Sequence, residues 1–339
     1  MEVQAMNKRA EPLLAIEDLR VTFPGQSTPV IDGLSLTLDR GEVLALVGES
    51  GSGKSMTALS LMRLLPAGGA IAGGRIRFDG EDVLSMSDRQ MNHMRGGRMA
   101  MLFQQPQAML DPTSRVSTQI AEPLRLHRGF GRRAAMQRVL DLLSDVGIPD
   151  PAVRARSFSH ELSGGMAQRV MIAAALSGDP EMLIADEPTT ALDVTVQAQI
   201  LRLIDEERRK RNLGTLLITH DLAVVAALAD RVAVMYAGRI VEEGPVKAVL
   251  EAPQHPYTQA LMRCSLLQSD KGGHLLSIPG SGAHARELSC GCRFHPRCSA
   301  ALKHGIESRC MGSEPALAAD QDGHMTRCWA VQTEKETAA

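Results

Sequence analysis

Along the first 250 residues, short runs of apolar residues alternate with longer stretches in which apolar residues recur at helical spacing. The runs at 43–47 and 182–185 contain only apolar residues, which is typical of strands buried on both faces of a parallel sheet. Residues 55–65 follow the first run with the spacing of an amphipathic helix. This alternation predicts an α/β domain with a buried parallel sheet. Further strands are predicted at 16–23, 74–78, 215–219 and 231–236.

Two other stretches depart from this alternation. Residues 106–176 carry helical periodicity, most clearly at 132–146, and no strand-like run, which predicts a helical subdomain inserted into the α/β core. Beyond residue 252 the composition shifts to Pro, His, Gly, Ser and Cys with little periodicity. We therefore expect one large domain over residues 1–252 and a small, irregular, cysteine-containing module over residues 253–339.

Charge and composition argue against nucleic-acid-binding, membrane-spanning and exported proteins. The chain has 37 Lys and Arg against 39 Asp and Glu, so it lacks the cationic surplus of nucleic-acid-binding proteins, and we expect no nucleic-acid partner. Its longest apolar run covers 222–229, whereas a membrane-spanning helix needs about 20 apolar residues. Residues 1–14 carry scattered charges and no apolar stretch of signal-peptide length. These features predict a protein that works in the cytoplasm.

A phosphate-binding motif lies between the first buried strand and the helix after it. Residues 48–55 read Gly-Glu-Ser-Gly-Ser-Gly-Lys-Ser, which matches G-x-x-x-x-G-K-[ST]. Glycines let the backbone wrap around a polyphosphate, and the helix N-terminus adds the positive end of its dipole. We expect Lys54 to reach the β- and γ-phosphates and the Ser55 hydroxyl to bind Mg²⁺. The candidate nucleotide-binding residues here are Gly48, Glu49, Ser50, Gly51, Ser52, Gly53, Lys54, Ser55 and Met56.

Two acidic residues follow the apolar run at 182–185. Asp186 is predicted to bind Mg²⁺ directly or through water, and Glu187 to polarise the water that attacks the γ-phosphate. An acidic pair at a helix N-terminus before Pro188 is the alternative. The metal interpretation accounts for both carboxylates and for their order, so the sequence predicts a nucleoside triphosphatase.

A second glycine motif precedes the apolar helical run at 170–176. Residues 162–168 read Leu-Ser-Gly-Gly-Met-Ala-Gln, and a Ser-Gly-Gly element at a helix start is another anion site. One chain thus carries two phosphate cradles but only one lysine-bearing loop. Either each chain binds two anions, or the second cradle closes on a nucleotide held by a partner chain in a head-to-tail pair.

The order and spacing of these motifs over roughly residues 14–250 resemble the nucleotide-binding subunit of ATP-binding cassette (ABC) transporters. The resemblance implies a P-loop NTPase fold with a RecA-like core and an inserted helical subdomain. It implies that Gln104 senses Mg²⁺ and the attacking water, that His220 contacts the γ-phosphate, and that Phe23 stacks on adenine. Gln105 adjoins Gln104, but the preceding Phe103 favours the latter. The resemblance further assigns nucleotide or dimer contacts to Ser163, Gly164, Gly165, Gln168 and Asp193.

The same resemblance implies a transport mechanism. Two ATP-binding chains close on two nucleotides, hydrolysis reopens them, and the movement passes through the helical subdomains to two transmembrane permease subunits. The chain would then lie peripherally on the cytoplasmic face of the inner membrane. Its partner in the pair is either a second copy or a homologous ATPase, and the subfamily resemblance below favours the homologue.

The segment at 253–261, Pro-Gln-His-Pro-Tyr-Thr-Gln-Ala-Leu, resembles the start of the C-terminal extension of oligopeptide and dipeptide transporter ATPases, as do 278–280 and 292–298. This subfamily implies import of peptides delivered by an extracytoplasmic substrate-binding protein. Nickel, glutathione and opine importers share much of the pattern, so the cargo stays open. Soluble ABC ATPases usually carry two cassettes or a long coiled coil, and P-loop kinases do not explain residues 162–168 or His220, so both are weaker alternatives.

All six cysteines lie at or after Cys264. Cys292, Cys298, Cys310 and Cys328 are separated by five, eleven and seventeen residues. Four thiolates in a cytoplasmic chain suit Zn²⁺ or an iron–sulfur cluster, and the subfamily resemblance favours a [4Fe-4S] cluster. Buried free thiols that pack a small module are the alternative.

Overall fold

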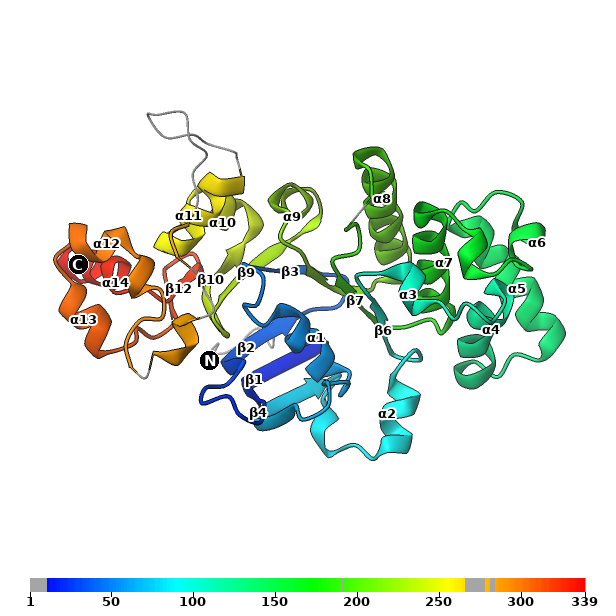
Figure 1. Ribbon diagram of the computed structural model, residues 1–339, viewed down its shortest axis with the longest axis horizontal. Helices are drawn as coiled ribbons and strands as arrows, with labels where there is room; N and C mark the ends of the chain where they lie inside the picture. Colours follow the sequence, from blue (N-terminus) through cyan, green and yellow to red (C-terminus); the bar gives the residue numbers. More distant parts are fainter. Residues whose placement is uncertain (1–10, 191, 266–277, 281–283, 289, 339) are drawn as a thin grey trace, which may run out of the picture.

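The computed structural model describes residues 11–190, 192–265, 278–280, 284–288 and 290–338 (Figure 1). Its main sheet has the strand order β11-β12-β10-β9-β3-β8-β7-β6. The five strands from β9 to β6 are parallel, whereas β10, β12 and β11 continue the sheet in antiparallel pairs. The strands are β3 (Val43–Val47), β6 (Met99–Leu102), β7 (Met182–Asp186), β8 (Gly214–Ile218), β9 (Arg231–Tyr236), β10 (Arg239–Pro245), β11 (Ala318–Ala319) and β12 (Met325–Thr326).

The central strands are apolar because both faces of the sheet are covered. Every residue of β3, β7 and β8 is buried. Val43, Ala45 and Val47 belong to one hydrophobic core, and Leu44 and Leu46 belong to the core on the opposite face. The strands predicted at 43–47, 182–185, 215–219 and 231–236 are confirmed, within a residue at their ends.

A separate antiparallel sheet has the order β2-β1-β4-β5. The strands predicted at 16–23 and 74–78 exist, but they do not join the parallel strands. They belong to this second sheet, whose buried face shares a core with Leu44 and Leu46. Its strands also show exposed positions, as expected of a sheet with one solvated face. The strands are β1 (Leu14–Thr22), β2 (Ile31–Leu38), β4 (Ala70–Phe78) and β5 (Glu81–Asp82).

Helices of the range 106–176 form a layer at one end of the main sheet, beyond β6 and β7 (Figure 1). The described residues of this range form no strand, as the periodicity predicts. The layer contains α3 (Pro106–Met109), α4 (Val116–His127), α5 (Arg132–Asp145), α6 (Pro151–Arg154) and α7 (Gly164–Ser177). The other helices of the first 252 residues are α1 (Lys54–Leu61), α2 (Asp88–Met94), α8 (Val194–Arg211), α9 (Leu222–Leu228) and α10 (Val246–Glu251).

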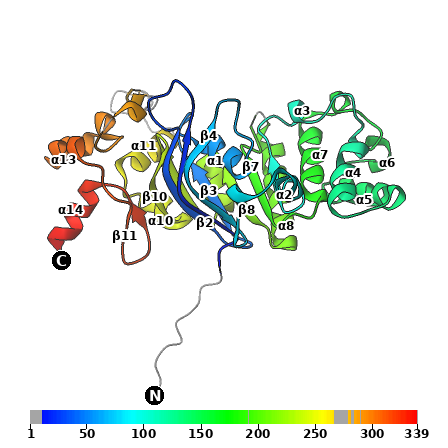
Figure 2. The same cartoon turned by 90° about the horizontal axis from the view of Figure 1, so that it is seen from below.

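The C-terminal segment lies at the opposite end of the molecule from this helical layer (Figure 2). It is more regular than its composition predicts, and the β11–β12 hairpin extends the main sheet beside β10. Several of its helices have only five or six residues, too few for periodicity to be detected in the sequence. The helices are α11 (Pro256–Ser265), α12 (Ser299–Lys303), α13 (Glu307–Gly312) and α14 (Trp329–Ala338).

Among the helices that the structure describes, none combines the length and apolar character needed to cross a bilayer. Residues 1–10, on which the absence of an export signal was partly argued, lie outside the described residues.

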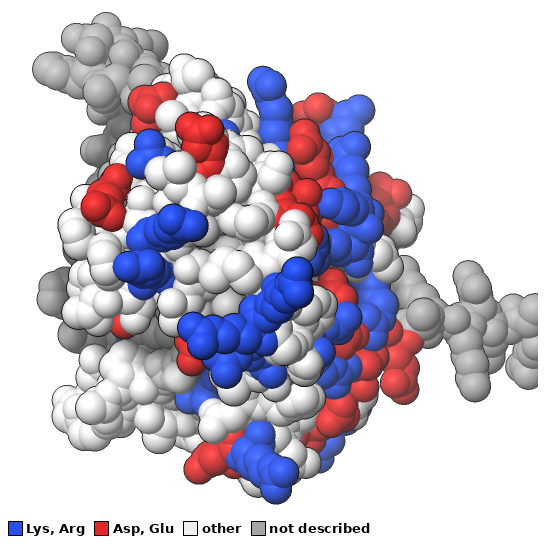
Figure 3. Space-filling view, turned by 90° about the vertical axis from the view of Figure 1, so that its right-hand side faces the viewer, with Lys and Arg blue, Asp and Glu red and all other residues white. Residues whose placement is uncertain are grey.

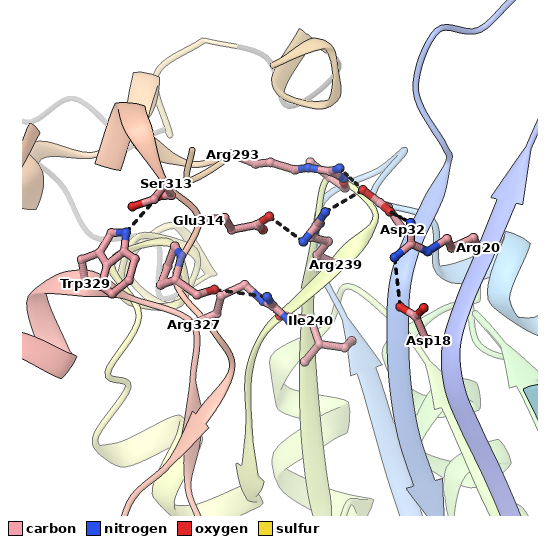
Figure 4. A network of polar contacts seen from close by, with 12 residues as sticks. Asp18, Arg20, Asp32, Arg239, Ile240, Arg293, Ser313, Glu314, Arg327 and Trp329 are labelled. Carbon is pink, nitrogen blue, oxygen red and sulfur yellow. Dashed lines mark hydrogen bonds and ion pairs between the residues drawn. The ribbon is translucent and has the colours of Figure 1, made fainter. Parts of the chain in front are cut away.

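A buried ionic network joins the C-terminal segment to both sheets (Figure 4). Asp32 on β2 accepts hydrogen bonds from Arg239 on β10, at 2.7 Å, and from Arg293. Arg239 also pairs with Glu314. Burial alone would raise the pKa of Asp32, but the hydrogen bond from Arg239 and the two positive charges hold it below its ordinary value.

We expect Asp32→Asn to lower the free energy of unfolding by about 2–4 kcal/mol at pH 7, because it leaves the buried Arg293 without its ion-pair partner and leaves Arg239 with Glu314 alone. The depressed pKa means that this stabilisation is complete above the ordinary aspartate pKa of 3.8 and is lost as the pH falls through the lower folded value. Urea unfolding at pH 7, 4 and 3 should therefore show a difference from wild type that shrinks in acid. Asp18→Asn, at an exposed pair with Arg20, is the matched control and should change little. An equal loss in both variants would contradict the role of the network.

Candidate nucleotide-binding site

The phosphate loop joins β3 to α1, in the strand–loop–helix context that the motif predicts. Gly48, Gly51 and Gly53 have φ angles of 154°, 77° and 115°, which L side chains rarely adopt. A Cβ atom on Gly48 would lie 2.1 Å from the carbonyl oxygen of Met235. The first glycine of the motif is therefore required both by its backbone angle and by the close approach of β9.

Lys54 is buried and its ammonium group lies over the loop. Its Nζ donates hydrogen bonds to the carbonyl oxygens of Gly48, at 2.7 Å, and Glu49, at 3.0 Å. Burial lowers the pKa of Lys54, while the negative charges of Glu187 and Asp186 oppose that shift. The Ser52 hydroxyl is buried without a hydrogen-bond partner among the described residues. An anionic oxygen that enters the loop would satisfy this hydroxyl, so the residues fit a phosphate.

Asp186 ends β7 beside Ser55 at the start of α1. Burial raises the pKa of Asp186 above its ordinary value; a hydrogen bond from Ser55 opposes the shift, and the charge of Glu187 adds to it. A hydroxyl and a carboxylate in contact are hard oxygen ligands of the kind that Mg²⁺ prefers. The pair therefore fits the metal site that the sequence predicts.

The structure brings together Glu187 and two polar residues from distant parts of the sequence. Glu187 Oε2 accepts hydrogen bonds from Gln104 Nε2, at 2.8 Å, and from Thr190 Oγ1, at 2.9 Å. His220 Nδ1 lies 3.1 Å from Glu187 Oε1. Burial alone would raise the pKa of Glu187, but the hydrogen bonds from Thr190 and His220 and nearby positive charge hold it below its ordinary value. The carboxylate is therefore ionised at neutral pH.

Two features of this carboxylate were not anticipated from the sequence. Thr190 is not among the residues predicted for the site, and its position three residues after Glu187 was the available signal. Glu187 also has a φ angle of +47°, a strained value for a residue with a side chain. Such strain persists where the surroundings fix a conformation, and it is enriched at functional sites.

The second glycine motif lies in the helical layer, away from the phosphate loop of the same chain (Figure 1). Ser163 caps α7, and its Oγ accepts a hydrogen bond from the Met166 N–H at 3.3 Å. A Cβ on Gly165 would lie 2.9 Å from a methyl carbon of Val196, so the motif packs against the start of α8. Gln168 is buried, and its Nε2 has no partner among the described residues. Gly164 begins the helix.

Two further candidates occupy other positions. Asp193 caps α8, where its Oδ1 accepts a hydrogen bond from the Val196 N–H at 2.9 Å; the neighbouring Ala191 lies outside the described residues. Phe23 follows β1, is half-buried and packs against the core of the antiparallel sheet. Its ring lies close to Gly69, so contact with adenine stays a prediction.

The four candidate cysteine ligands, Cys292, Cys298, Cys310 and Cys328, line a common cavity of about 10 Å³. Burial raises the pKa of Cys292 to about 12 and that of Cys310 to about 11, and neighbouring thiols add to both shifts. Within the described residues, no group of three or more Cys, His, Asp or Glu side chains is placed to hold a metal ion. The donor types suit a four-thiolate site, but in this structure the four are free thiols, of which Cys310 and Cys328 are buried and Cys292 and Cys298 are partly buried.

The C-terminal segment also contacts the phosphate loop, which the sequence did not indicate. Arg297 forms an ion pair with Glu49, at 2.8 Å, and Tyr257 Oη accepts a hydrogen bond from the Glu49 N–H at 2.8 Å.

Comparisons with known proteins identify the family of the chain. Residues 31–190 match the ABC transporter family, and residues 241–304 match the family "Oligopeptide/dipeptide transporter, C-terminal region". The dipeptide transport ATP-binding protein DppD of Escherichia coli is 44% identical over 318 residues, covering 93% of this chain and 96% of that protein. A probable peptide ABC transporter ATP-binding protein of Sinorhizobium fredii is 46% identical, covering 95% of this chain and 96% of that one.

Solved structures show the same fold. CbiO1 from Clostridium perfringens, part of an ABC transporter complex, matches with a TM-score of 0.63 and 27% identity, over 72% of this chain and 92% of that chain. A dimeric ATP-binding cassette bound to ADP and phosphate matches with a TM-score of 0.62 and 24% identity, over 69% and 98% respectively.

The chain belongs to the ABC transporter family as an ATP-binding subunit, with the fold of a P-loop NTPase. It is an ATPase whose reaction uses Mg²⁺. Within the family it carries the C-terminal region of the oligopeptide and dipeptide transporters.

Proposed function

We propose that this chain hydrolyses ATP to power the import of di- and oligopeptides through an ABC transporter. One observation supports the chemistry above the others: the Glu187 carboxylate is contacted by Gln104, Thr190 and His220. The peptide cargo is supported by the C-terminal region and by relatives whose names specify dipeptides or peptides. Nickel, glutathione or opine import by the same machinery is the alternative, and a non-transport ABC ATPase is the weaker one.

Within this proposal each group of the site has one task. Residues 48–56 bind the phosphates, and Lys54 contacts the β- and γ-phosphates. Ser55 and Asp186 would hold Mg²⁺ and Gln104 would sense it, and the bound ion would neutralise phosphate charge. Glu187 accepts a proton from the attacking water, while His220 contacts the γ-phosphate. Phe23 stacks on the adenine ring.

The second glycine motif acts on the nucleotide of a partner. Ser163, Gly164, Gly165 and Gln168 contact the γ-phosphate bound by the other ATPase, and Asp193 lies along the interface. The separation of this motif from the phosphate loop supports the arrangement, as does the exposure of Val194 beside Asp193. The pair is head-to-tail, so each of its two sites uses both chains. Its second member is a homologous chain or a second copy.

The chain is divided into two units. Residues 1–252 form the cassette, with the helical subdomain at 106–176, and residues 253–339 form the extension. The chain lies peripherally on the cytoplasmic face of the inner membrane, held there by two permease subunits. An extracytoplasmic substrate-binding protein delivers the peptide to the complex.

A groove of about 1,000 Å³ supports permease docking. It lies between α2 of the core and the end of α4 in the helical layer. A permease segment bound there would therefore be displaced when the helical layer moves relative to the core. Figure 3 looks onto the helical end of the molecule, where uncharged side chains fill much of the surface between separate charged ones. The residues lining the groove include Met86, Arg89, His93, Arg95, Leu126 and His127.

Replacing Glu187 with Gln should reduce ATP hydrolysis at least about 100-fold, because the amide no longer accepts the proton of the attacking water. ATP binding and ATP-driven pairing should persist, since the loop and Lys54 are unchanged. Steady-state phosphate release and equilibrium binding of Mg–ATP measure the two effects separately. Normal turnover in this variant would show that another group serves as the base.

Leu126→Glu should weaken co-purification with the permease subunits, because it places a charge in the apolar part of the groove. Leu302→Glu in α12 is a matched control, since the two leucines are 68% and 67% exposed. Both variants should bind ATP as the wild type does. Equal permease recovery with Leu126→Glu and Leu302→Glu would exclude the groove as the docking surface.

For the extension, the proposal includes a [4Fe-4S] cluster held by Cys292, Cys298, Cys310 and Cys328, with Zn²⁺ as the alternative. Their convergence on one cavity supports it. Cys292 and Cys310 would have to lose their protons to bind a metal, since burial raises the pKa of both thiols.

Anaerobically purified protein should then show iron and a broad absorbance band at about 400 nm, both lost in Cys298→Ser. Cys264→Ser, in α11, is the control and should keep both. Zinc without iron would show that the site binds Zn²⁺ and not a cluster. The absence of both metals would show that the four cysteines are free thiols.

A further inference from the structure

Glu49, the second residue of the phosphate loop, is fixed at three separate points. Its N–H donates to Tyr257 Oη at 2.8 Å, and its carbonyl oxygen accepts from Lys54 Nζ at 3.0 Å. Its carboxylate accepts two parallel hydrogen bonds from Arg297, at 2.8 and 3.0 Å. Two of the three partners come from the C-terminal extension, so the extension restrains a residue inside the loop.

Arg297 is itself held in place for this contact. Its side chain is only 6% exposed. Nε donates to the carbonyl oxygen of Pro279 at 2.6 Å, and the terminal nitrogens also donate to the carbonyl of Ile278 and to Tyr236 Oη. The paired hydrogen bonds to Glu49 raise the pKa of Arg297. Because its other donors are already hydrogen-bonded, the Arg297 guanidinium loses little conformational entropy when it binds a carboxylate. The paired hydrogen bonds to Glu49 are also a strong form of ion pair.

The same short segment reaches the far end of the loop by a second route. Arg293 donates to the carbonyl oxygen of Ala237, in the turn between β9 and β10. The N–H of the next residue, Gly238, donates to the carbonyl oxygen of Ser52 at 2.8 Å. Arg293 also contacts Asp32 in the network of Figure 4. Arg293 and Arg297 therefore act near opposite ends of the phosphate loop.

The charge of Glu49 gives this contact a consequence for ligand binding. An unpaired carboxylate in a loop that binds a polyphosphate would repel the ligand, and burial would strengthen the repulsion. A bidentate arginine cancels the charge and keeps the carboxylate directed toward the extension. Simple stabilisation of the extension would not require the partner of Arg297 to lie inside the phosphate loop.

We infer that Arg297 is a positioning residue for ATP: through Glu49 it holds the phosphate loop in its binding conformation and neutralises a negative charge beside the phosphates. The C-terminal extension is thus part of the nucleotide site. The inference rests on the proposed ATP-binding function and adds a residue to it.

Titration calorimetry of the full chain with Mg–ATP tests the inference. Arg297→Gln should weaken binding about tenfold, which corresponds to about 1.4 kcal/mol. Arg309→Gln, in α13 of the same extension, should bind within about twofold of wild type, because Arg309 contacts Trp329 and Thr333 instead. Adding Glu49→Gln to Arg297→Gln should recover much of the lost affinity, since it removes the charge left unpaired.

That recovery separates positioning from structural damage, and circular dichroism checks that each variant is folded. If Arg297→Gln does not fold, Arg297→Lys serves instead: it keeps the charge but not the paired geometry, and its affinity should fall below that of wild type. Wild-type affinity in Arg297→Gln or Arg297→Lys, or a double variant that binds no better than Arg297→Gln, would overturn the inference. A wild-type chain that binds no ATP would instead contradict the proposed function.

Discussion

The contact between Glu187 and its polar partners is the interaction on which the rest of the site depends. Gln104 follows β6, Thr190 follows β7 and His220 follows β8, so the carboxylate is held only when three strands occupy adjacent positions. The hydrogen bonds keep Glu187 ionised and directed, and they retain it in a strained backbone conformation. A proton acceptor for the attacking water thus depends on the order of strands in the sheet.

The sheet meets this requirement because its central strands are parallel. The order β3-β8-β7-β6 places the ends of these strands along one edge, which brings the phosphate loop, Asp186 and His220 together. The same sheet continues through β10 and β12 into the C-terminal extension. In the extension, Arg297 and Tyr257 form hydrogen bonds with Glu49, so the extension contacts the phosphate loop at this edge of the sheet.

The sequence predicted those elements whose structure is determined by a few contiguous residues. The apolar run at 43–47 and the glycine spacing of 48–55 are sufficient for a buried strand and a phosphate loop. The antiparallel sheet was missed as a unit because a strand's pattern does not specify its partner. The contact between Glu49 and Arg297 joins residues 248 positions apart, and a local sequence pattern does not predict contacts at such a separation. Thr190 could have been proposed from the sequence, since it lies only three residues beyond Glu187.

In the proposed function, ATP hydrolysis by this chain drives peptide import. The most direct measurement is ATP hydrolysis and labelled-dipeptide uptake by the complete transporter, with its permease subunits, partner ATPase and binding protein, in proteoliposomes. We expect that peptide-loaded binding protein stimulates hydrolysis and that the dipeptide accumulates on the side that holds the ATPase subunits. Hydrolysis that is indifferent to peptide, with no accumulation of dipeptide, would contradict it.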